Sequence, residues 1–275
     1  MEIRALDAPF GCEVVGVDLS RPLPDEAAQR IRQEFLKHGL LIIRNQHLNE
    51  RQFVDYGRHF GSYESYESTL SEYLKPDYPD ILVLSNIVEN GRKLGVQDAG
   101  QYWHTDRSYV ARPAWASILH SIRVPRGDNG EPLGDTLFSS SIAAFAALPA
   151  GEQARLRKLS ALHRYVFRFS KPNDSMPEVV HPVVLSHPVT GAPCLYVNAG
   201  FTHSLVGMPA EESEALLSAL YEHVKRDEFT YRHRWEVGDV LMWDNYSTQH
   251  CAVSNYTPQQ PRLLWRTTLE GFALA

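Results

Sequence analysis

The sequence predicts a mainly β fold with added helices, and a jelly-roll barrel fits its elements. Three observations support this: many short strand-like segments, helical segments inserted between or added outside them, and no linker, repeat or low-complexity tract in 275 residues. All-β barrels and sandwiches of this length often form one domain, so we expect a single domain over residues 1–275. Hydrophobic periodicity alone does not distinguish a jelly roll from another β sandwich.

The N-terminal part predicts two helices and two buried strands. A first amphipathic helix begins at Pro24-Asp25 and ends at Gly39, with an apolar face formed by Ala28, Ile31 and Phe35. Residues 40–43 (Leu-Leu-Ile-Ile) and 81–84 (Ile-Leu-Val-Leu) are typical of short buried strands. Asn49 is expected to cap a second helix that continues through Phe60.

Residues 86–101 are expected to form a long loop, because they contain Asn90-Gly91 and further glycine and acidic breaks. Loops of this length are uncommon in compact domains unless they have a function. We interpret the segment as a lid over the functional site, with a disordered surface loop as the alternative.

The C-terminal half predicts further strands and a helix-containing insert over residues 141–226. Helices are expected within 141–160 and over 209–224, the second with two glutamates in its first turn. Strands are expected at 115–121, 136–139, 164–170, 179–185, 194–198 and 262–269. Residues 229–235 and 240–243 predict a hairpin around Gly238-Asp239.

Composition and charge exclude several classes of protein. A net charge of −6 gives no support for nucleic-acid binding, and no run of about 18 apolar residues predicts a membrane span. The first residues show no secretory signal, so we expect a cytoplasmic location. Three widely spaced cysteines, Cys12, Cys194 and Cys251, argue against a disulfide framework or a structural zinc cluster.

The most informative feature is His104-Thr105-Asp106, read together with His250. On an extended strand, His104 and Asp106 would point to the same face, where both could bind one metal ion. An isolated His-x-Asp carries little weight. With His250 from a distant strand it forms a set of two imidazoles and one carboxylate, which suits non-haem Fe(II) because it leaves three positions open.

These residues lie within a wider resemblance. The chain resembles the taurine/2-oxoglutarate dioxygenase (TauD/TfdA) family of Fe(II)- and 2-oxoglutarate-dependent oxygenases, from Phe10-Gly11 to the strand at 266–269. The matching blocks are Trp103-His104-Thr105-Asp106, Gly134-Asp135-Thr136-Leu137-Phe138, Ile142-Ala143-Ala144-Phe145, His181-Pro182-Val183-Val184, Leu195-Tyr196-Val197-Asn198 and Trp243-Asp244-Asn245. The resemblance implies the double-stranded β-helix form of the jelly roll, with the metal inside one end.

The resemblance also implies roles for individual residues. His104, Asp106 and His250 are the implied catalytic metal ligands, with Fe(II), 2-oxoglutarate and O2 as cofactors and co-substrates. Arg262 is the implied anchor for the distal carboxylate of 2-oxoglutarate, which a guanidinium can hold with two charge-assisted hydrogen bonds. Thr136 would donate a further hydrogen bond; a surface ion pair is the alternative role for Arg262.

Substrate contacts are expected at Arg266, Tyr63, Tyr66 and Gln101. Arg266 lies four residues after Arg262, on the same strand face, and matches an arginine that binds the substrate sulfonate in the taurine-oxidising relative. A second contact to 2-oxoglutarate or a structural ion pair are its alternatives. Another cationic set, Arg164, Arg168 and Lys171, either holds a substrate carboxylate or forms a solvated basic strand.

The expected function is the oxidation, by hydroxylation, of a C–H bond in a small anionic substrate, with release of succinate and CO2. Halogenating relatives replace the ligand carboxylate, so Asp106 favours hydroxylation. Ser62-Tyr63-Glu64 and Gly100 depart from the taurine enzyme's pattern, which argues against taurine as substrate. The alternatives are a zinc hydrolase using the same triad and a non-catalytic 2-oxoglutarate or iron sensor. Relatives also lead us to expect a homodimer or homotetramer.

Overall fold

The core of the molecule is an eight-stranded sheet. The structure is a computed structural model that describes residues 1–66, 68–97, 99–165 and 178–274. Only β2 and β3 pair in parallel. The strand order is β1 (Glu2–Ala5), β2 (Cys12–Val15), β3 (Leu40–Ile43), β16 (Val240–Asp244), β8 (Ala116–Arg123), β18 (Leu263–Thr268), β5 (Tyr78–Ser85) and β4 (Leu74–Lys75).

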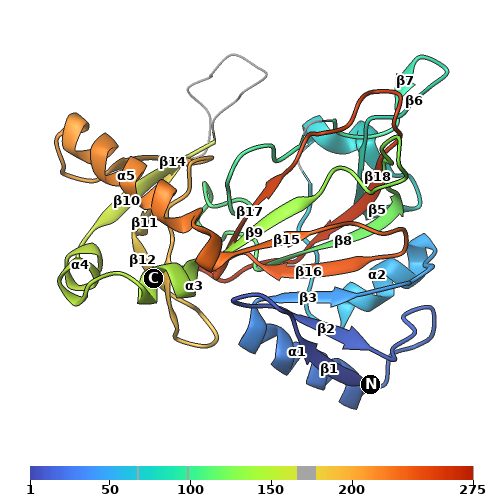
Figure 1. Cartoon of the computed structure of the whole chain (residues 1–275), viewed down its shortest axis with the longest axis horizontal. Coiled ribbons are helices and arrows are strands. Elements are labelled where there is room, and N and C mark those ends of the chain that lie inside the picture. The colour runs from blue at the N-terminus through green and yellow to red at the C-terminus, as the bar shows by residue number, and fades with distance from the viewer. Residues whose placement is uncertain (67, 98, 166–177, 275) are drawn as a thin grey trace.

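A three-stranded sheet closes the barrel over one face of the large sheet. Its strand order is β15 (Thr230–His233), β9 (Thr136–Ser140) and β17 (Thr248–Ala252). Apolar side chains of both sheets fill the interior together, with Leu82, Leu119 and Trp243 from the large sheet and Phe138 from β9. These two facing sheets confirm the predicted jelly-roll fold (Figure 1).

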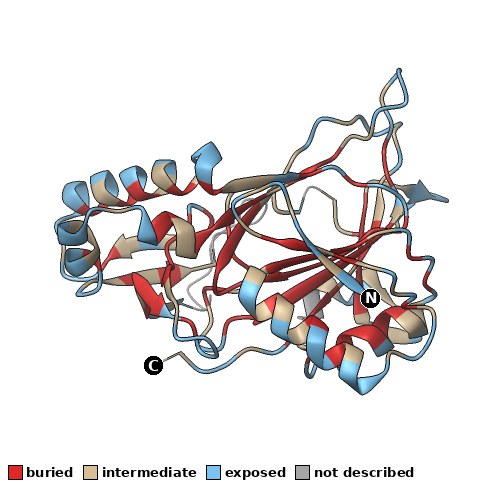
Figure 2. Ribbon diagram, turned by 60° about the horizontal axis from the view of Figure 1, so that its bottom comes forward, coloured by how far each residue is buried: buried red, intermediate tan, exposed pale blue. Residues whose placement is uncertain are grey.

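Two helices cover the other face of the large sheet, and both were predicted. Helix α1 (Asp25–His38) buries Ala28, Ile31 and Phe35, and it ends at Gly39, whose φ of 69° is left-handed and favours glycine. Helix α2 (Glu50–Arg58) begins with a capping box between Asn49 and Gln52. Figure 2 shows the buried residues where these helices meet the sheet, with the outer helix faces exposed.

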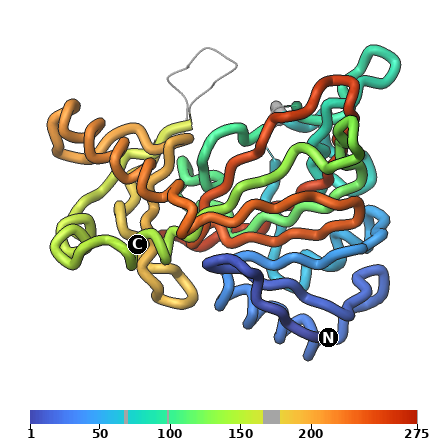
Figure 3. Tube along the Cα trace, in the orientation of Figure 1, coloured from blue at the N-terminus to red at the C-terminus, as the bar shows by residue number. Residues whose placement is uncertain are grey.

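The part between β9 and β15 forms a lobe beside the barrel, around its own apolar cluster (Figure 3). The helical stretch expected within 141–160 is broken into two short helices, and a strand begins at Ser160. The elements of the lobe are α3 (Ser141–Ala146), α4 (Ala150–Leu156), β10 (Ser160–Arg164), β11 (Glu178–Pro182), β12 (Val184–Ser186), β13 (Pro193–Leu195), β14 (Thr202–Leu205), α5 (Ala210–Val224) and η2 (Asp227–Phe229). Residues 166–170 of the predicted strand at 164–170 lie outside the described residues.

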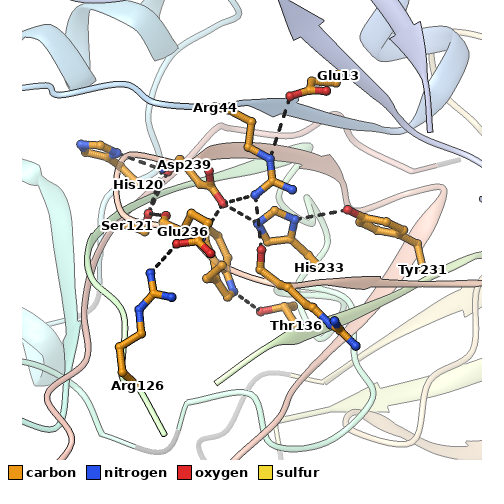
Figure 4. Close-up of polar contacts among 12 residues, drawn as sticks. Glu13, Arg44, His120, Ser121, Arg126, Thr136, Tyr231, His233, Glu236 and Asp239 are labelled. Atoms are coloured by element: carbon orange, nitrogen blue, oxygen red, sulfur yellow. Dashed lines mark hydrogen bonds and ion pairs between the residues drawn. The ribbon is translucent and has the colours of Figure 1, made fainter. Parts of the chain in front are cut away.

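The predicted hairpin around Gly238-Asp239 is wrong. Strand β15 pairs with β9, whereas β16 pairs with β3 and β8, so the chain crosses from one sheet to the other. The buried carboxylate of Asp239 stabilises this crossing: its Oδ2 lies 3.0 Å from His233 Nε2 and 2.5 Å from Arg44 Nη1, and it accepts a bond from Glu236 N (Figure 4). Polar contacts to a distant strand therefore replace the expected local pairing.

Residues 86–101 are more ordered than a plain loop. They contain a short hairpin of β6 (Val88–Glu89) and β7 (Arg92–Lys93), and Val96 is bridged to β5 through Ser85 N and Val83 O. A 3-10 helix, η1 (Ser68–Tyr73), precedes β4. None of the described helices is long and apolar enough to cross a membrane.

Candidate active site

Three buried side chains meet at one end of the barrel interior. His104, Asp106 and His250 are 5%, 5% and 7% exposed, and their ligand atoms lie within 4.8 Å of one another. His250 comes from β17, and His104 forms an isolated antiparallel bridge with it. The ring centroids of the two histidines are 4.1 Å apart. The structure thus brings together the three ligands expected from the sequence.

The position of Asp106 differs from the one predicted by strand alternation. Asp106 lies in a turn rather than on an extended strand, and the next residue, Arg107, has a left-handed φ of 57°. The turn is fixed by Asn245, whose Oδ1 accepts a bond from Asp106 N and whose carbonyl accepts one from Thr105 Oγ1. Tertiary contacts, and not strand alternation, place the carboxylate beside His104.

A backbone carbonyl orients the His104 ring so that Nε2 faces the cluster. Its Nδ1 lies 2.7 Å from the carbonyl oxygen of Tyr102, which can only accept a hydrogen bond. Nδ1 therefore carries a proton, and Nε2 lies 3.6 Å from Asp106 Oδ1. This is the orientation that metal-binding histidines commonly take from a backbone carbonyl.

The charges around the cluster favour the metal-binding forms of its groups. Burial alone would raise the pKa of Asp106, but Arg266 and the two histidines hold it well below its usual value. Burial, and then the neighbouring His104, lower the pKa of His250, so this imidazole stays neutral. Two imidazoles and one carboxylate fit a divalent metal ion.

Arg262 is partly buried and lies next to Tyr256. Its guanidinium carbon lies 5.8 Å from the Tyr256 ring centroid, and burial lowers its pKa. No carboxylate among the described residues forms an ion pair with it, so a partly buried positive charge faces a small cavity that Gln101 also lines. A Cβ at Gly134 would lie 3.2 Å from Arg262 Nε, and its φ of 75° also favours glycine.

Thr136 lies on β9, on the same strand face as Phe138 in the barrel interior. Its Oγ1 accepts a hydrogen bond of 3.0 Å from Trp235 Nε1. Because an indole N–H is only a donor, the hydroxyl proton of Thr136 is left to bond a different acceptor. Sequence reasoning missed Trp235, which lies on the crossing that Asp239 stabilises.

The predicted substrate residues separate into two groups. Arg266 Nη2 lies 2.7 Å from Asp106 Oδ2, and Tyr66 donates its hydroxyl to the carbonyl oxygen of Arg266. Tyr63 instead bonds Val54 O at 2.6 Å and contacts Thr267, which faces away from Arg266 on β18. The structure therefore does not bring Tyr63 to the metal cluster.

The second cationic set is not assembled at the site. Arg164 forms an exposed ion pair with Glu178 of the neighbouring strand at 2.6 Å, which agrees with the solvated alternative. Arg168 and Lys171 lie outside the described residues. Two further residues that sequence reasoning did not single out, Ser117 and Asn245, contact Asp106 directly; Asn245 belongs to a matching block, but nothing in the sequence marked Ser117.

Comparison with known proteins identifies the family. The chain matches the family described as "Taurine catabolism dioxygenase TauD, TfdA family" over residues 2–268. The chain belongs to the TauD/TfdA family. It is therefore an α-ketoglutarate-dependent dioxygenase, α-ketoglutarate being another name for 2-oxoglutarate.

Relatives of the TauD/TfdA chain differ in what they oxidise. The α-ketoglutarate-dependent sulfate ester dioxygenase of Pseudomonas putida is 31% identical, over 98% of this chain and 90% of its own length. The 2,4-dichlorophenoxyacetate dioxygenase of Cupriavidus pinatubonensis is 31% identical over 88% of each chain. A taurine dioxygenase structure from Burkholderia xenovorans has a TM-score of 0.84, with 33% identity over 98% of this chain and 89% of that one. AAD-2, solved with Mn(II) and N-oxalylglycine, has a TM-score of 0.82, with 27% identity over 99% and 98%.

Proposed function

We propose that this TauD/TfdA dioxygenase uses Fe(II), 2-oxoglutarate and O2 to hydroxylate a C–H bond of a small anionic substrate, releasing succinate and CO2. The observation that carries the proposal is the buried cluster of His104, Asp106 and His250 with two arginines, Arg262 and Arg266, in the same barrel. Family membership supports the co-substrate, and the donor set supports iron.

Iron would be held by Nε2 of His104, a carboxylate oxygen of Asp106 and a ring nitrogen of His250. Bound Fe(II) supplies the redox chemistry that couples O2 reduction to oxidation of 2-oxoglutarate and substrate. The protein residues orient the ligands: Tyr102 O fixes the His104 tautomer, and Asn245 fixes the turn that carries Asp106. The presence of Asp106 favours hydroxylation over halogenation, as expected from the sequence.

The distal carboxylate of 2-oxoglutarate would be held by Arg262 and Thr136. Arg262 offers a partly buried guanidinium without a carboxylate partner among the described residues, and Thr136 has a hydroxyl proton that Trp235 leaves available. The AAD-2 structure contains N-oxalylglycine, a dicarboxylate of similar shape, which supports a comparable pocket here. Gln101 lines the cavity of Arg262, so we move it from the substrate contacts to this region.

The anionic group of the substrate would bind Arg266, beside Tyr66. Arg266 is close enough to Asp106 to place a bound substrate next to the metal. Relatives that act on sulfate esters, sulfonates and phenoxyacetates support an anion. We retain residues 86–101 as a lid, because Gln97, Ala99 and Gln101 line the Arg262 cavity.

Two earlier expectations stay predictions: the homodimer or homotetramer, and the cytoplasmic location. The zinc hydrolase alternative gains no support, since the matching relatives are dioxygenases and since it gives Arg262 no role. A 2-oxoglutarate or iron sensor without turnover would also keep the cluster of His104, Asp106 and His250. Succinate formation distinguishes such a sensor from an enzyme.

The proposal is tested by measuring succinate with Fe(II), 2-oxoglutarate and oxygen against a panel of sulfonates, sulfate esters, phenoxyacetates, and amino acids with their N-modified derivatives. We expect one class to raise succinate above the substrate-free rate, and Arg266→Gln to remove that stimulation while 2-oxoglutarate binding remains. Tight 2-oxoglutarate binding with no succinate from any compound would favour the sensor. Stimulation that survives in Arg266→Gln would contradict the assignment of the substrate anion to Arg266.

A further inference from the structure

The carboxylate of Asp106 is held by its neighbours at one of its two oxygens. Oδ2 accepts a hydrogen bond of 2.6 Å from Ser117 Oγ and lies 2.7 Å from Arg266 Nη2. In the part of the chain that the structure describes, Oδ1 has no such donor, and its near neighbour is His104 Nε2 at 3.6 Å. At 3.6 Å this contact is longer than a hydrogen bond. The two oxygens are therefore chemically different.

The direction of the hydrogen bond from Ser117 is fixed from outside. Asn245 Oδ1 accepts bonds from Trp243 Nε1 at 3.1 Å and from Asp106 N at 3.3 Å. Both of these groups only donate, which assigns the amide: its oxygen faces them, and Nδ2 faces Ser117 Oγ at 3.2 Å. Ser117 Oγ must then accept from Asn245, and its single proton goes to Asp106 Oδ2.

The residues of this series of hydrogen bonds are buried. Ser117 and Asn245 are fully buried, and Trp243 and Asp106 are 1% and 5% exposed. In this series of hydrogen bonds, each donor is paired with one acceptor. Reversing one of these bonds would leave a buried polar group unpaired. Such a group costs about 1–3 kcal/mol, and the arrangement with the proton on the Asp106 side is therefore strongly favoured.

We propose that Ser117 is a positioning residue that makes Asp106 a one-oxygen metal ligand, presenting Oδ1 and occupying Oδ2. The inference rests on the proposed function, in which Asp106 binds the metal. A carboxylate that bound through both oxygens would occupy a further position around the metal. Holding Oδ2 keeps that position open for the co-substrate and O2, and orients the ligand before the metal arrives.

The test compares two buried serines in Mn(II) binding by the otherwise intact protein. Ser117→Ala removes the donor to Asp106, whereas Ser139→Ala removes an equally buried serine whose Oγ donates at 2.6 Å to Val224 O. Losing an orienting neighbour of a metal ligand typically weakens binding 10- to 100-fold, and we expect about tenfold for Ser117→Ala. Free Mn(II), counted by electron paramagnetic resonance, gives the affinity, and the Mn(II)-induced rise in Tm gives a second readout.

A second variant, Asn245→Asp, tests the direction of the chain with Ser117 left in place. The new carboxylate cannot donate to Ser117, so the serine proton is drawn away from Asp106. The added negative charge would by itself strengthen Mn(II) binding. The proposed series of hydrogen bonds instead predicts weaker Mn(II) affinity in Asn245→Asp. It also predicts little further loss of Mn(II) affinity when Ser117→Ala is added to that variant.

The outcomes separate this inference from the proposed function. Weaker Mn(II) binding in Ser117→Ala, with wild-type binding in Ser139→Ala, supports the role of Ser117. Equal affinity in both serine variants overturns it and leaves the metal assignment intact. If Asp106→Ala binds Mn(II) as tightly as wild type, the metal assignment itself fails, and the inference fails with it.

Discussion

His104 and His250 exchange both of their backbone hydrogen bonds, His104 N to His250 O at 3.0 Å and His250 N to His104 O at 2.8 Å. This single antiparallel bridge joins two residues 146 positions apart in the chain, as the difference of their numbers shows. Side chains of directly opposite residues lie on the same face, so the bridge places both imidazoles together. It is the backbone feature from which the rest of the candidate site is built.

Arg262→Met should weaken 2-oxoglutarate binding about 10- to 100-fold, because hydrogen bonds to a charged group contribute about 1.5–3 kcal/mol. Calorimetric titration of the Mn(II)-loaded protein measures this. Since no described carboxylate pairs with Arg262, we expect the Tm without 2-oxoglutarate to stay the same or rise. Arg164→Met, which removes an exposed arginine, is the control. Unchanged 2-oxoglutarate affinity in Arg262→Met would remove this residue from the site.

Trp235→Phe should weaken 2-oxoglutarate binding about fivefold, the effect of losing a hydrogen bond of about 1 kcal/mol. Without the indole N–H, the Thr136 hydroxyl is no longer directed toward the co-substrate. Trp265→Phe is the matched control, because its Nε1 has no hydrogen-bond partner in the described part of the chain. Equal affinities in the two variants would argue against an orienting role for Trp235.

Asp239→Asn should lower the free energy of unfolding by about 3 kcal/mol, since it leaves buried partners of a charged group unpaired. Asp239 is fully buried and contacts Arg44, His233 and Glu236 N at the crossing between the sheets. Glu236→Gln, which removes only an exposed pair with Arg126, should cost less than about 1 kcal/mol. Urea denaturation measures both, and similar losses would show that the crossing does not depend on Asp239.

The wild-type protein should lose stability as the pH falls below about 6.5. Burial lowers the pKa of His163 to about 3 and that of His120 to about 4. As the pH falls below about 6.5, these histidines therefore bind protons in the unfolded chain before they do so in the folded protein. The free energy of unfolding is highest above pH 6.5 and decreases as the pH approaches the folded pKa values of about 4 and about 3. For His163 alone the effect is up to about 1.4 kcal/mol per pH unit.

The contribution of His163 is measured by comparing wild type with His163→Gln in urea at several pH values. The difference in unfolding free energy should shrink as the pH falls from about 6.5 to about 4.5. His203→Gln, which replaces an exposed histidine, is the control substitution. A difference that is constant over this range would contradict a depressed pKa for His163.

Much of the fold could be predicted from local signals, and the metal cluster could be predicted from a family pattern. Helix α1 has an apolar face spaced by three and four residues and a terminal Gly39, and β3 is a continuous apolar run. The order His104, Asp106, His250, Arg262 along the chain matched a family pattern, and the structure brings the first three together.

The remaining features depend on contacts between distant segments. The hairpin prediction at Gly238-Asp239 failed because Asp239 bonds Arg44, far away in sequence. Tyr63 was predicted to contact the substrate, but it contacts Thr267, which faces away from Arg266 on β18. The face of β18 that Tyr63 meets depends on the alternation of that strand, which the sequence near Tyr63 does not encode. Ser117 was missed because a single serine on a buried strand carries no motif.

The most direct test of the central claim is succinate formation from 2-oxoglutarate with Fe(II), compared between wild type and Asp106→Ala. We predict iron-dependent succinate in wild type, not supported by zinc, and its loss in Asp106→Ala while Arg262 still binds 2-oxoglutarate. Succinate formation by Asp106→Ala at the wild-type rate, or equal activity with zinc, would contradict the assignment of His104, Asp106 and His250 as the iron ligands.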